Sequence, residues 1–372
     1  MTGPIPHAAL LDPPPTTPER FAAIEQGVAR LLGTERDVVL LQAEAILALE
    51  AAARGLGVEG TVCLNVITGP YGAHFGEWLA AGGAEVIDLE IPLERAVRAD
   101  EIATVLEARP EISVLSLVHA EVATGTVNPL ADVARVAREH DVLTVVDAVA
   151  SVGGHALPID ELGLDVVMLG PQKALGGPAG ISMLTVSDRA WDAFAAAADG
   201  WTGARGSILS LLDWKERWID AGRTAIPGTP STLELLALEA ACARVAAEGA
   251  DAAIVRHARI SAACRAGVRA LGLDPWVAAD DEVCALTTAI RLPDGVDRAA
   301  LVDRARTAYG VALTPGGGSL RDLMVRIDHM GPAAEPRTIL AGIAGLGGAL
   351  TDLGAAVDVG AGVAATVDAL RE

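Results

Sequence analysis

The feature that most constrains the fold is an alternation of apolar runs with helix-like segments through the first half of the chain. Strands that are apolar on both faces, separated by helices, are typical of a parallel sheet covered on both sides. The alternation therefore predicts an α/β fold with a mostly parallel sheet, whose active site lies beyond the carboxyl ends of the strands. The seven largely apolar runs are residues 37–42, 60–67, 84–91, 112–119, 142–149, 165–170 and 181–187.

The length of 372 residues exceeds what one hydrophobic core usually supports, so we expect two units. Six prolines within residues 1–18 prevent long regular structure, which predicts an extended N-terminal arm. A large unit over residues 19–256 would contain the seven strands. A smaller α+β unit would occupy residues 257–372, with strands near 284–292 and 325–331 and helices near 299–310 and 338–354.

Charge and composition exclude several classes of partner. The net charge of −21 disfavours nucleic acid and anionic membranes. No apolar run reaches membrane-spanning length and the N-terminus lacks signal-peptide features, so we expect a cytoplasmic protein. None of the cysteines lies at metal-ligand spacing, and we expect no metal site and four buried thiols, Cys63, Cys242, Cys264 and Cys284.

Three residues next to predicted strands suggest a catalytic site. Asp147 ends an apolar run, Lys173 lies in a Gly/Pro-rich turn between two runs, and Tyr71 follows a run and a Gly-Pro pair. Taken singly, they could be a turn acid, a solvated loop lysine and a packing aromatic. Taken together, they predict a pyridoxal site, in which the lysine forms a Schiff base, the acid pairs with the ring nitrogen and the aromatic stacks on the ring.

Two longer segments carry a family resemblance. The segment VVDAVASVGGHALPIDELGLDVVMLGPQKALGGPAG, residues 145–180, resembles the core of the class V aminotransferases of the alanine–glyoxylate and serine–pyruvate group. VHAEVATGTVNPL, residues 118–130, is similar to that group's segment before the aspartate strand. The resemblance covers nearly the whole chain. It implies a fold-type I pyridoxal-phosphate transferase with a large pyridoxal-binding domain and a small C-terminal domain, assembled as a homodimer or dimer of dimers.

One turn departs from that group's pattern. Most members hold the cofactor phosphate in a Ser-Gly-Thr or Ser-Gly-His loop, whereas this chain has QAEAILALEA, with Glu44 where the loop begins. A carboxylate about 4 Å from a phosphate would repel it by ~4 kcal/mol, or about three powers of ten in affinity. A carboxylate is instead a good acceptor for a hydroxymethyl group. Glu44 thus predicts unphosphorylated pyridoxal or pyridoxamine as a substrate; otherwise it is an acid of the first helical turn that points outward.

A narrower resemblance agrees with this interpretation. LLQAEAILALEAAA, TGPYGAHFGEW, SILSLLDW and HMGPAAEP resemble the pyridoxamine–pyruvate aminotransferases of bacterial vitamin B6 degradation. The resemblance implies the conversion of pyridoxamine and pyruvate to pyridoxal and L-alanine. Lys173 would then move a proton as general base and acid, and Glu44 would anchor the 5′-hydroxyl. Thr124 and His119 would lie near the ring, unless they only cap a turn.

The same resemblance implies two arginines that hold the carboxylate of the amino or oxo acid. Arg326 matches one of them, and Gly317 falls at the position of the other. Arg321 lies nearby and could substitute, or could be an ordinary surface residue. The acid partner therefore stays open. Three alternatives also stay open: an ordinary pyridoxal-phosphate-dependent alanine or serine aminotransferase, a pyridoxal-phosphate-dependent lyase, and a vitamer-binding protein without turnover.

Overall fold

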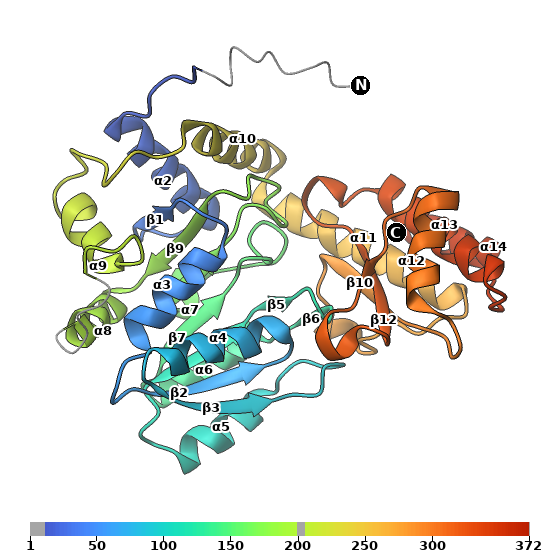
Figure 1. Cartoon of the computed structure of the whole chain (residues 1–372), viewed down its shortest axis with the longest axis horizontal. Helices are drawn as coiled ribbons and strands as arrows, with labels where there is room; N and C mark the ends of the chain where they lie inside the picture. Colours follow the sequence, from blue (N-terminus) through green and yellow to red (C-terminus); the bar gives the residue numbers. More distant parts are fainter. Residues whose placement is uncertain (1–11, 199–204, 372) are drawn as a thin grey trace.

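The computed structural model describes residues 12–198 and 205–371, and it has two lobes (Figure 1). The larger lobe contains the sheet, and the smaller lobe contains most of the last third of the chain. Residues 1–11 of the expected arm lie outside the described residues, and residues 12–17 precede the first helix without regular structure.

The sheet of the large lobe has seven strands in the order β1-β9-β8-β7-β4-β2-β3. Strand β9 runs antiparallel to both β1 and β8, and all other neighbours are parallel. The predicted α/β fold with a mostly parallel seven-stranded sheet is confirmed. The strands are β1 (Val38–Leu41), β2 (Val62–Ile67), β3 (Glu85–Glu90), β4 (Val114–Val118), β7 (Leu143–Asp147), β8 (Val166–Leu169) and β9 (Ser182–Val186), and a separate hairpin pairs β5 (Ala120–Glu121) with β6 (Thr126–Val127).

Both faces of this sheet are covered by other parts of the lobe. Every residue of β1, β4, β8 and β9 is therefore buried. Helix α3 packs on β8 and β9, and α4 packs on β2, β3 and β4. Helix α6 packs on β7, and α2 packs on β1. The helices of this lobe are α2 (Pro18–Leu32), α3 (Ile46–Leu56), α4 (Pro70–Ala81), α5 (Ala99–Ala108), α6 (Leu130–Glu139), α7 (Ile159–Leu162), α8 (Asp188–Ala198), α9 (Leu211–Trp214), the π-helical turn η1 (Lys215–Ile219) and α10 (Thr232–Glu248).

Small side chains explain how closely α3 approaches the sheet. Ala48 and Ala51–Ala53 are buried on α3. Their short side chains allow the helix to lie close to the strands. Their methyl groups pack against the branched side chains of strands such as β8, where each buried Val or Leu contributes about 1.5–3 kcal/mol. The sequence thus favours a compact helix–sheet layer with little room for large aromatic side chains.

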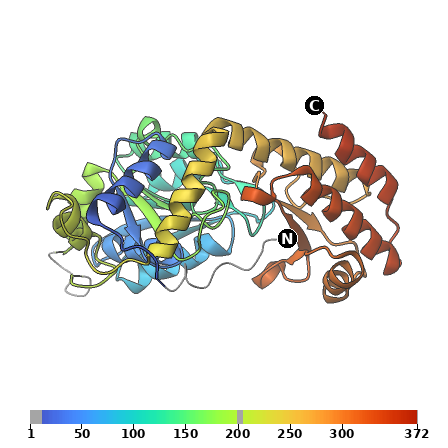
Figure 2. The same cartoon turned by 90° about the horizontal axis from the view of Figure 1, so that it is seen from above.

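The small lobe has its own three-stranded antiparallel sheet, in the order β10-β12-β11, and its own hydrophobic core. Helix α11 (Ala250–Ala270) runs from one lobe into the other (Figure 2) and contributes Ala253 to the large core and Ile260 to the small one. The predicted division between residues 256 and 257 falls inside this continuous helix, and it stays a prediction. The other elements are η2 (Asp280–Glu282), β10 (Thr287–Arg291), α12 (Arg298–Tyr309), β11 (Thr314–Pro315), η3 (Gly318–Leu320), β12 (Met324–Asp328), η4 (Gly331–Ala333), α13 (Pro336–Asp352) and α14 (Val359–Ala369).

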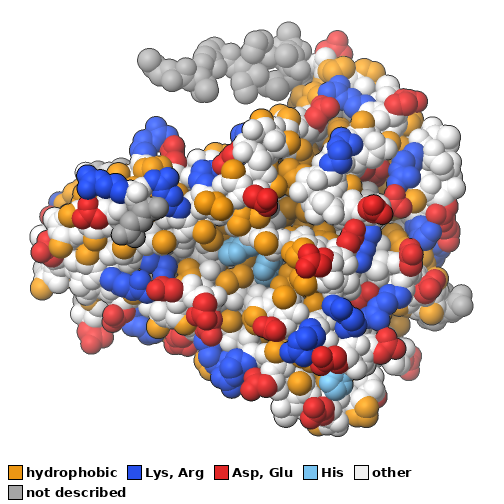
Figure 3. Space-filling view, turned by 180° about the vertical axis from the view of Figure 1, so that it is seen from behind, with side chains coloured by type: hydrophobic (Ala, Val, Ile, Leu, Met, Phe, Trp, Pro, Cys, Tyr) orange, Lys and Arg blue, Asp and Glu red, His pale blue; other side chains and the backbone are white. Residues whose placement is uncertain are grey.

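Histidine side chains join the two lobes. The backbone N–H of Ala285 donates to His155 Nε2 at 3.0 Å, and that of Gly331 donates to His257 Nε2 at 2.9 Å. Both acceptor nitrogens must be unprotonated, and burial lowers the pKa of both rings. On the face opposite to Figure 1, histidine side chains show among apolar ones near the centre (Figure 3). A groove of the molecule is lined by His155, Ser261 and Ala285 among others.

Three expected properties can be compared with the described residues. The four cysteines are free and buried, as expected. In the described ranges, no group of three or more His, Cys, Asp or Glu side chains is placed to hold a metal ion. Among the described helices, none has both the length and the apolar character that crossing a membrane requires.

Candidate active site

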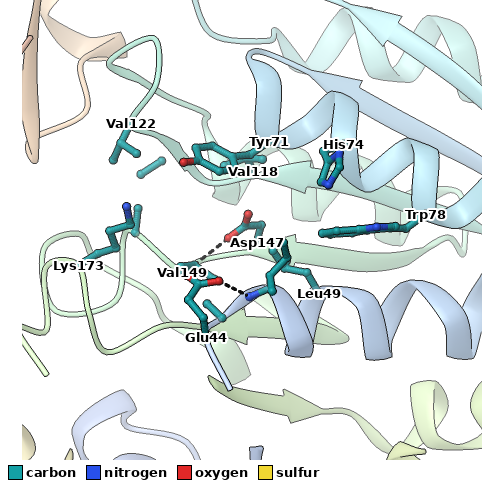
Figure 4. Close-up of a pocket in the computed structure, with 14 residues that line it drawn as sticks. Glu44, Leu49, Tyr71, His74, Trp78, Val118, Val122, Asp147, Val149 and Lys173 are labelled. Atoms are coloured by element: carbon teal, nitrogen blue, oxygen red, sulfur yellow. Dashed lines mark hydrogen bonds between the residues drawn. The ribbon is translucent and has the colours of Figure 1, made fainter. Parts of the chain in front are cut away.

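The candidate site forms where several strands end at one edge of the large sheet. Because β9 is antiparallel to both of its neighbours, β1 points in the same direction as β8. The carboxyl ends of β1, β2, β4, β7 and β8 therefore meet at that edge. The pocket there has about 620 Å³ of empty space, part of it open to solvent, and it brings together Glu44, Tyr71, Asp147 and Lys173 (Figure 4).

Asp147 is the last residue of β7, and its side chain lies in the middle of the pocket lining. Its Oδ1 accepts a 2.9 Å hydrogen bond from the Val149 N–H. Burial raises the pKa of Asp147 to about 6; the Val149 N–H opposes this rise, the Glu44 carboxylate adds to it and the Lys173 ammonium opposes it. The carboxyl is therefore ionised at neutral pH in a poorly solvated place, where a cationic ring nitrogen is a favourable partner.

Lys173 lies in the loop between β8 and β9, at one end of the pocket (Figure 4). Within residues 12–198 and 205–371, its ammonium has no hydrogen-bond or ion-pair partner, whereas the ammonium of Lys215 pairs with Asp220. The small lobe closes on its backbone, since a Cβ added to Gly331 would lie 2.8 Å from the Lys173 carbonyl oxygen. Lys173 thus offers an uncommitted amine on a loop held by both lobes.

The side chains of Tyr71 and Val149 lie on opposite sides of the pocket (Figure 4). Between them, a planar ring could stack on the Tyr71 face while Val149 contacts its other face. Tyr71 is 47% exposed. Its partial burial and, to a smaller extent, the negative charge of Glu121 raise the pKa of its phenol. Tyr71 is therefore neutral at physiological pH, and it suits stacking and hydrogen bonding.

Glu44 follows β1, and its carboxylate is at the N-terminus of α3. Its Oε2 accepts a 2.9 Å hydrogen bond from the Ile46 N–H, and its Oε1 accepts a 2.6 Å bond from Gln172 Nε2. The side chain thus accepts from the first N–H of α3 and also lines the pocket, so it does not point away from the site. The N-terminus of α3, where an anion could bind, is thus occupied by the carboxylate of Glu44.

Sequence reasoning missed several residues of this pocket. His74 and Trp78 line the end of the pocket away from Lys173, with ring centroids 4.4 Å apart (Figure 4). They follow Tyr71 by three and seven positions on α4, which places all three on one helix face. That spacing was visible in the sequence. For Gln172, the sequence offered only its position beside Lys173 as a sign of a role in the site. Its partner Glu44 is 128 residues away, so their hydrogen bond leaves no local pattern.

Glu121 is a further missed residue, and it is fully buried beside α4. Its Oε1 accepts a 3.2 Å bond from the Ala123 N–H, while Oε2 has no partner in the described part of the chain. Burial raises its pKa to about 7. A Cβ on Gly69 would lie too close to the carboxyl carbon of Glu121, so a larger residue before α4 would displace the Glu121 side chain. Glu121 thus fixes the turn that presents Tyr71.

His119 and Thr124 do not line the pocket. His119 is buried, with its Nδ1 3.0 Å from Ser151 Oγ, and burial lowers the pKa of the ring to about 3, so the imidazole is neutral. Thr124 Oγ1 lies 2.8 Å from Thr126 Oγ1 and 3.2 Å from the Thr68 carbonyl oxygen. Both side chains lie behind the wall of the pocket in this structure.

Arg326 reaches the pocket wall from the small lobe. Its Nη1 donates to the carbonyl oxygen of Val122, whose side chain lines the pocket, and its Nε lies 3.8 Å from Asp328 Oδ1. Gly317 is exposed, with no atom near enough to contact an added Cβ. Arg321 is also exposed. Among the sequence candidates for a carboxylate site, only Arg326 contacts a residue of the pocket.

The donor set of the pocket fits a pyridoxal-type ring. It offers a flat aromatic face, a buried carboxylate for a ring nitrogen and an uncommitted amine for an aldehyde carbon. Among the described residues that line it, no cluster of cations is placed for a phosphate, and the group at the N-terminus of α3 is the Glu44 carboxylate. The residues therefore fit the ring and its aldehyde better than they fit a phosphate ester.

Comparisons with known proteins give one consistent family. The family model described as aminotransferase class V matches residues 7–331. Pyridoxamine–pyruvate transaminase of Mesorhizobium japonicum is 38% identical over 329 residues, which are 88% of this chain and 82% of that protein. L-aspartate–glyoxylate aminotransferase of Paracoccus denitrificans is 30% identical over 352 residues, covering 93% of this chain and 87% of that one. The crystal structure of pyridoxamine-pyruvate aminotransferase from Mesorhizobium loti superposes with a TM-score of 0.90 and 35% identity, covering 95% of this chain and 89% of that chain.

Proposed function

The chain belongs to the class V aminotransferase family, and from this membership we propose that it transfers an amino group from pyridoxamine to pyruvate, giving pyridoxal and L-alanine. The proposal takes the substrates from the names of the two Mesorhizobium proteins. The observation that carries it is the position of Glu44, whose carboxylate occupies the N-terminus of α3 at the pocket. The vitamer would thus be a substrate, with a place in vitamin B6 metabolism.

Glu44 supports an unphosphorylated guest for an electrostatic reason. Its two oxygens accept from the Ile46 N–H and from Gln172, so the carboxylate is held at the pocket. A phosphate at the same helix terminus would face that negative charge at short range. A 5′-hydroxyl would instead donate to a free lone pair of Glu44, which has lone pairs left after these two bonds.

The other residues have roles that suit this reaction. The bound ring acts as an electron sink, which is the chemistry that pyridoxal compounds supply. Asp147 would hold the ring nitrogen protonated, and Tyr71 and Val149 would keep the ring between them. Lys173 Nζ would bind the aldehyde carbon and, once released, would move the proton between the two reacting carbons.

Arg326 would hold the carboxylate of the oxo acid from the small lobe. Thr124 and His119 would support the pocket from behind, through Thr126 and Ser151 respectively. Because Gly317 stands where the resemblance implies a second arginine, the carboxylate would be held by fewer charges, and Arg321 would have to turn inward to replace it.

A second copy of the chain would complete the assembly. Ile46 and Tyr71 are 45% and 47% exposed beside the pocket, although both are large apolar side chains at a candidate active site. A homodimer, alone or as a dimer of dimers, would cover them. Its signature would be a mass of two or four chains in light scattering, at concentrations where the enzyme is active.

The experiment that tests the proposed function needs no added pyridoxal phosphate. The purified chain is desalted, supplied with pyridoxamine and pyruvate, and followed for pyridoxal and alanine. Equal amounts of both products over many turnovers support the proposal. No turnover, together with activity when pyridoxal phosphate and an amino acid–oxo acid pair are supplied, would make it an ordinary phosphate-dependent aminotransferase. Ammonia and an oxo acid released from one amino acid would make it a lyase.

A further inference from the structure

Strand β12 of the small lobe places two opposite charges on the face that meets the large lobe. Arg326 and Asp328 are two residues apart and therefore point to the same face of the strand. Their cross-strand partners on β10 are Ala289 and Thr287. A Cβ added to Gly125 of the large lobe would lie 3.2 Å from the Ala289 side chain, so this face packs on the segment that follows β5.

The guanidinium of Arg326 is held at the pocket wall with part of its donor set unused. Its Nη1 donates to the Val122 carbonyl oxygen, and its Nε is buried without a hydrogen-bond partner among the described residues. The side chain is only 15% exposed. Arg326 is therefore positioned to receive one carboxylate from the pocket side.

Asp328 is fixed beside this arginine. Its Oδ1 accepts a 2.7 Å hydrogen bond from Thr287 Oγ1, and its Oδ2 accepts a 2.6 Å bond from Thr314 Oγ1. Its Oδ1 is 3.8 Å from Arg326 Nε, and the side chain is 32% exposed. The two threonines prevent the carboxylate from turning away, and each oxygen keeps a lone pair for a further donor.

The pair changes what the subsite can recognise. A substrate whose carboxylate binds Arg326 would also lie near the negative charge of Asp328. If that substrate carried a second carboxylate, Asp328 would repel it, and no second cation would offset the repulsion. A hydroxyl or ammonium group in the same position would find an acceptor in place. The charge of Arg326 alone predicts a preference for acids, whereas the pair predicts discrimination among them.

We propose that Asp328 is a specificity-determining residue, which accepts second substrates with one carboxylate, including those with a hydrogen-bond donor or cation on the side chain, and which rejects dicarboxylates. The inference rests on the proposed function, since it concerns the amino or oxo acid that exchanges with the vitamer. The substrate class is amino acids with one carboxylate, such as alanine, serine and ornithine, and the corresponding oxo acids, ranked above aspartate and glutamate.

The test measures kcat/KM for pyridoxamine formation from pyridoxal with L-alanine, L-serine, L-ornithine and L-aspartate. In the native chain we expect alanine, serine and ornithine all to exceed aspartate. In Asp328→Asn we expect the aspartate-to-alanine ratio to rise about tenfold and the ornithine-to-alanine ratio to fall about tenfold. Asp322→Asn is the matched control, because Asp322 is an exposed acid of the same lobe that pairs with Arg298, and it should leave both ratios unchanged.

The outcomes separate this inference from the proposed function. If no amino acid gives pyridoxamine, the proposed function is wrong. If alanine is turned over but Asp328→Asn has the native ratios, the vitamer reaction stands and the role of Asp328 is overturned. If Asp328→Asn does not fold, the native chain decides alone, and a preference for aspartate over alanine or ornithine contradicts the inference.

Discussion

Gln172 donates a 2.6 Å hydrogen bond to Glu44, and Lys173 is the next residue along the chain. The bond joins the turn after β1 to the loop after β8. In the sheet, β9 alone lies between these two strands. One side chain therefore links the group proposed to anchor the 5′-hydroxyl with the amine proposed to bind the aldehyde. The distance between these two groups sets which ring can bridge them.

Replacement of Glu44 by serine should reverse the preference of the protein for pyridoxal over pyridoxal phosphate. Loss of the carboxylate removes the repulsion toward phosphate and exposes the N–H groups of the first turn of α3. We expect the dissociation constant of pyridoxal phosphate to fall at least tenfold and that of pyridoxal to rise about tenfold, as measured by absorbance titration. Glu50→Gln is the control, because Glu50 is a half-buried acid of the same helix that pairs with Arg54. Unchanged relative affinities in Glu44→Ser would remove the assigned role.

Replacement of Gln172 by alanine should weaken the position of Glu44 without removing its charge. The Oε1 of Glu44 would lose its 2.6 Å donor, and the carboxylate would gain rotational freedom. We expect pyridoxal affinity to fall by about three- to tenfold, while pyridoxal phosphate stays excluded. Gln26→Ala, on α2 away from the pocket, should bind as the native chain does. If pyridoxal phosphate bound well to Gln172→Ala, the exclusion would depend on Gln172 rather than on the charge of Glu44.

The chain contains two lysines, Lys173 and Lys215, and only the first lines the pocket. Treatment with pyridoxal followed by borohydride should leave one vitamer covalently attached to Lys173, because an amine near an aldehyde condenses with it. Lys173→Ala should lose turnover by several orders of magnitude and yield no labelled peptide. Lys215→Ala should behave as the native chain, since Lys215 pairs with Asp220 at 2.9 Å. Label on Lys215 in the native chain would contradict the assignment.

Vitamer binding should depend on the ionisation of Asp147. Its pKa is raised to about 6, so the carboxyl is charged above that pH and becomes neutral as the pH falls through 6. A neutral acid cannot pair with a cationic ring nitrogen, and we expect pyridoxal affinity to fall by up to tenfold per pH unit below 6. Asp147→Asn should bind more weakly at pH 7.5 and should lack that inflection. An identical inflection in Asp147→Asn would assign it to another group.

The same carboxyl should make the ligand-free protein less stable at neutral pH. Because the folded-state pKa of Asp147 lies above its ordinary value of 3.8, folding favours the protonated form, and stability falls as the pH rises from about 4 through 6. Asp147→Asn removes the buried charge, so its free energy of unfolding at pH 7.5 should exceed the native value by on the order of 1–3 kcal/mol. Urea unfolding should show that gain shrinking toward pH 4. A destabilised Asp147→Asn at pH 7.5 would contradict it.

The sequence by itself determined the layered architecture and predicted residues that the fold brings to one pocket. Apolar runs separated by helical segments allow few arrangements other than a parallel sheet covered on both faces, and a residue that follows such a run must lie at the sheet edge. Asp147, Lys173 and Tyr71 were therefore identifiable from local pattern, and so was the unusual charge of Glu44. The face of α4 shared by Tyr71, His74 and Trp78 could also have been identified from helical spacing.

Only the tertiary structure decided which distant residues touch. The bond from Gln172 to Glu44 spans 128 residues, that from Arg326 to Val122 spans 204, and the carboxyl group that faces Gly69 belongs to Glu121 of another element. No periodicity encodes these pairs, because they depend on strand order and on how the small lobe packs against the large one. The placement of Asp328 beside Arg326 follows from strand alternation, but its restraint by Thr287 and Thr314 arises only when three strands align.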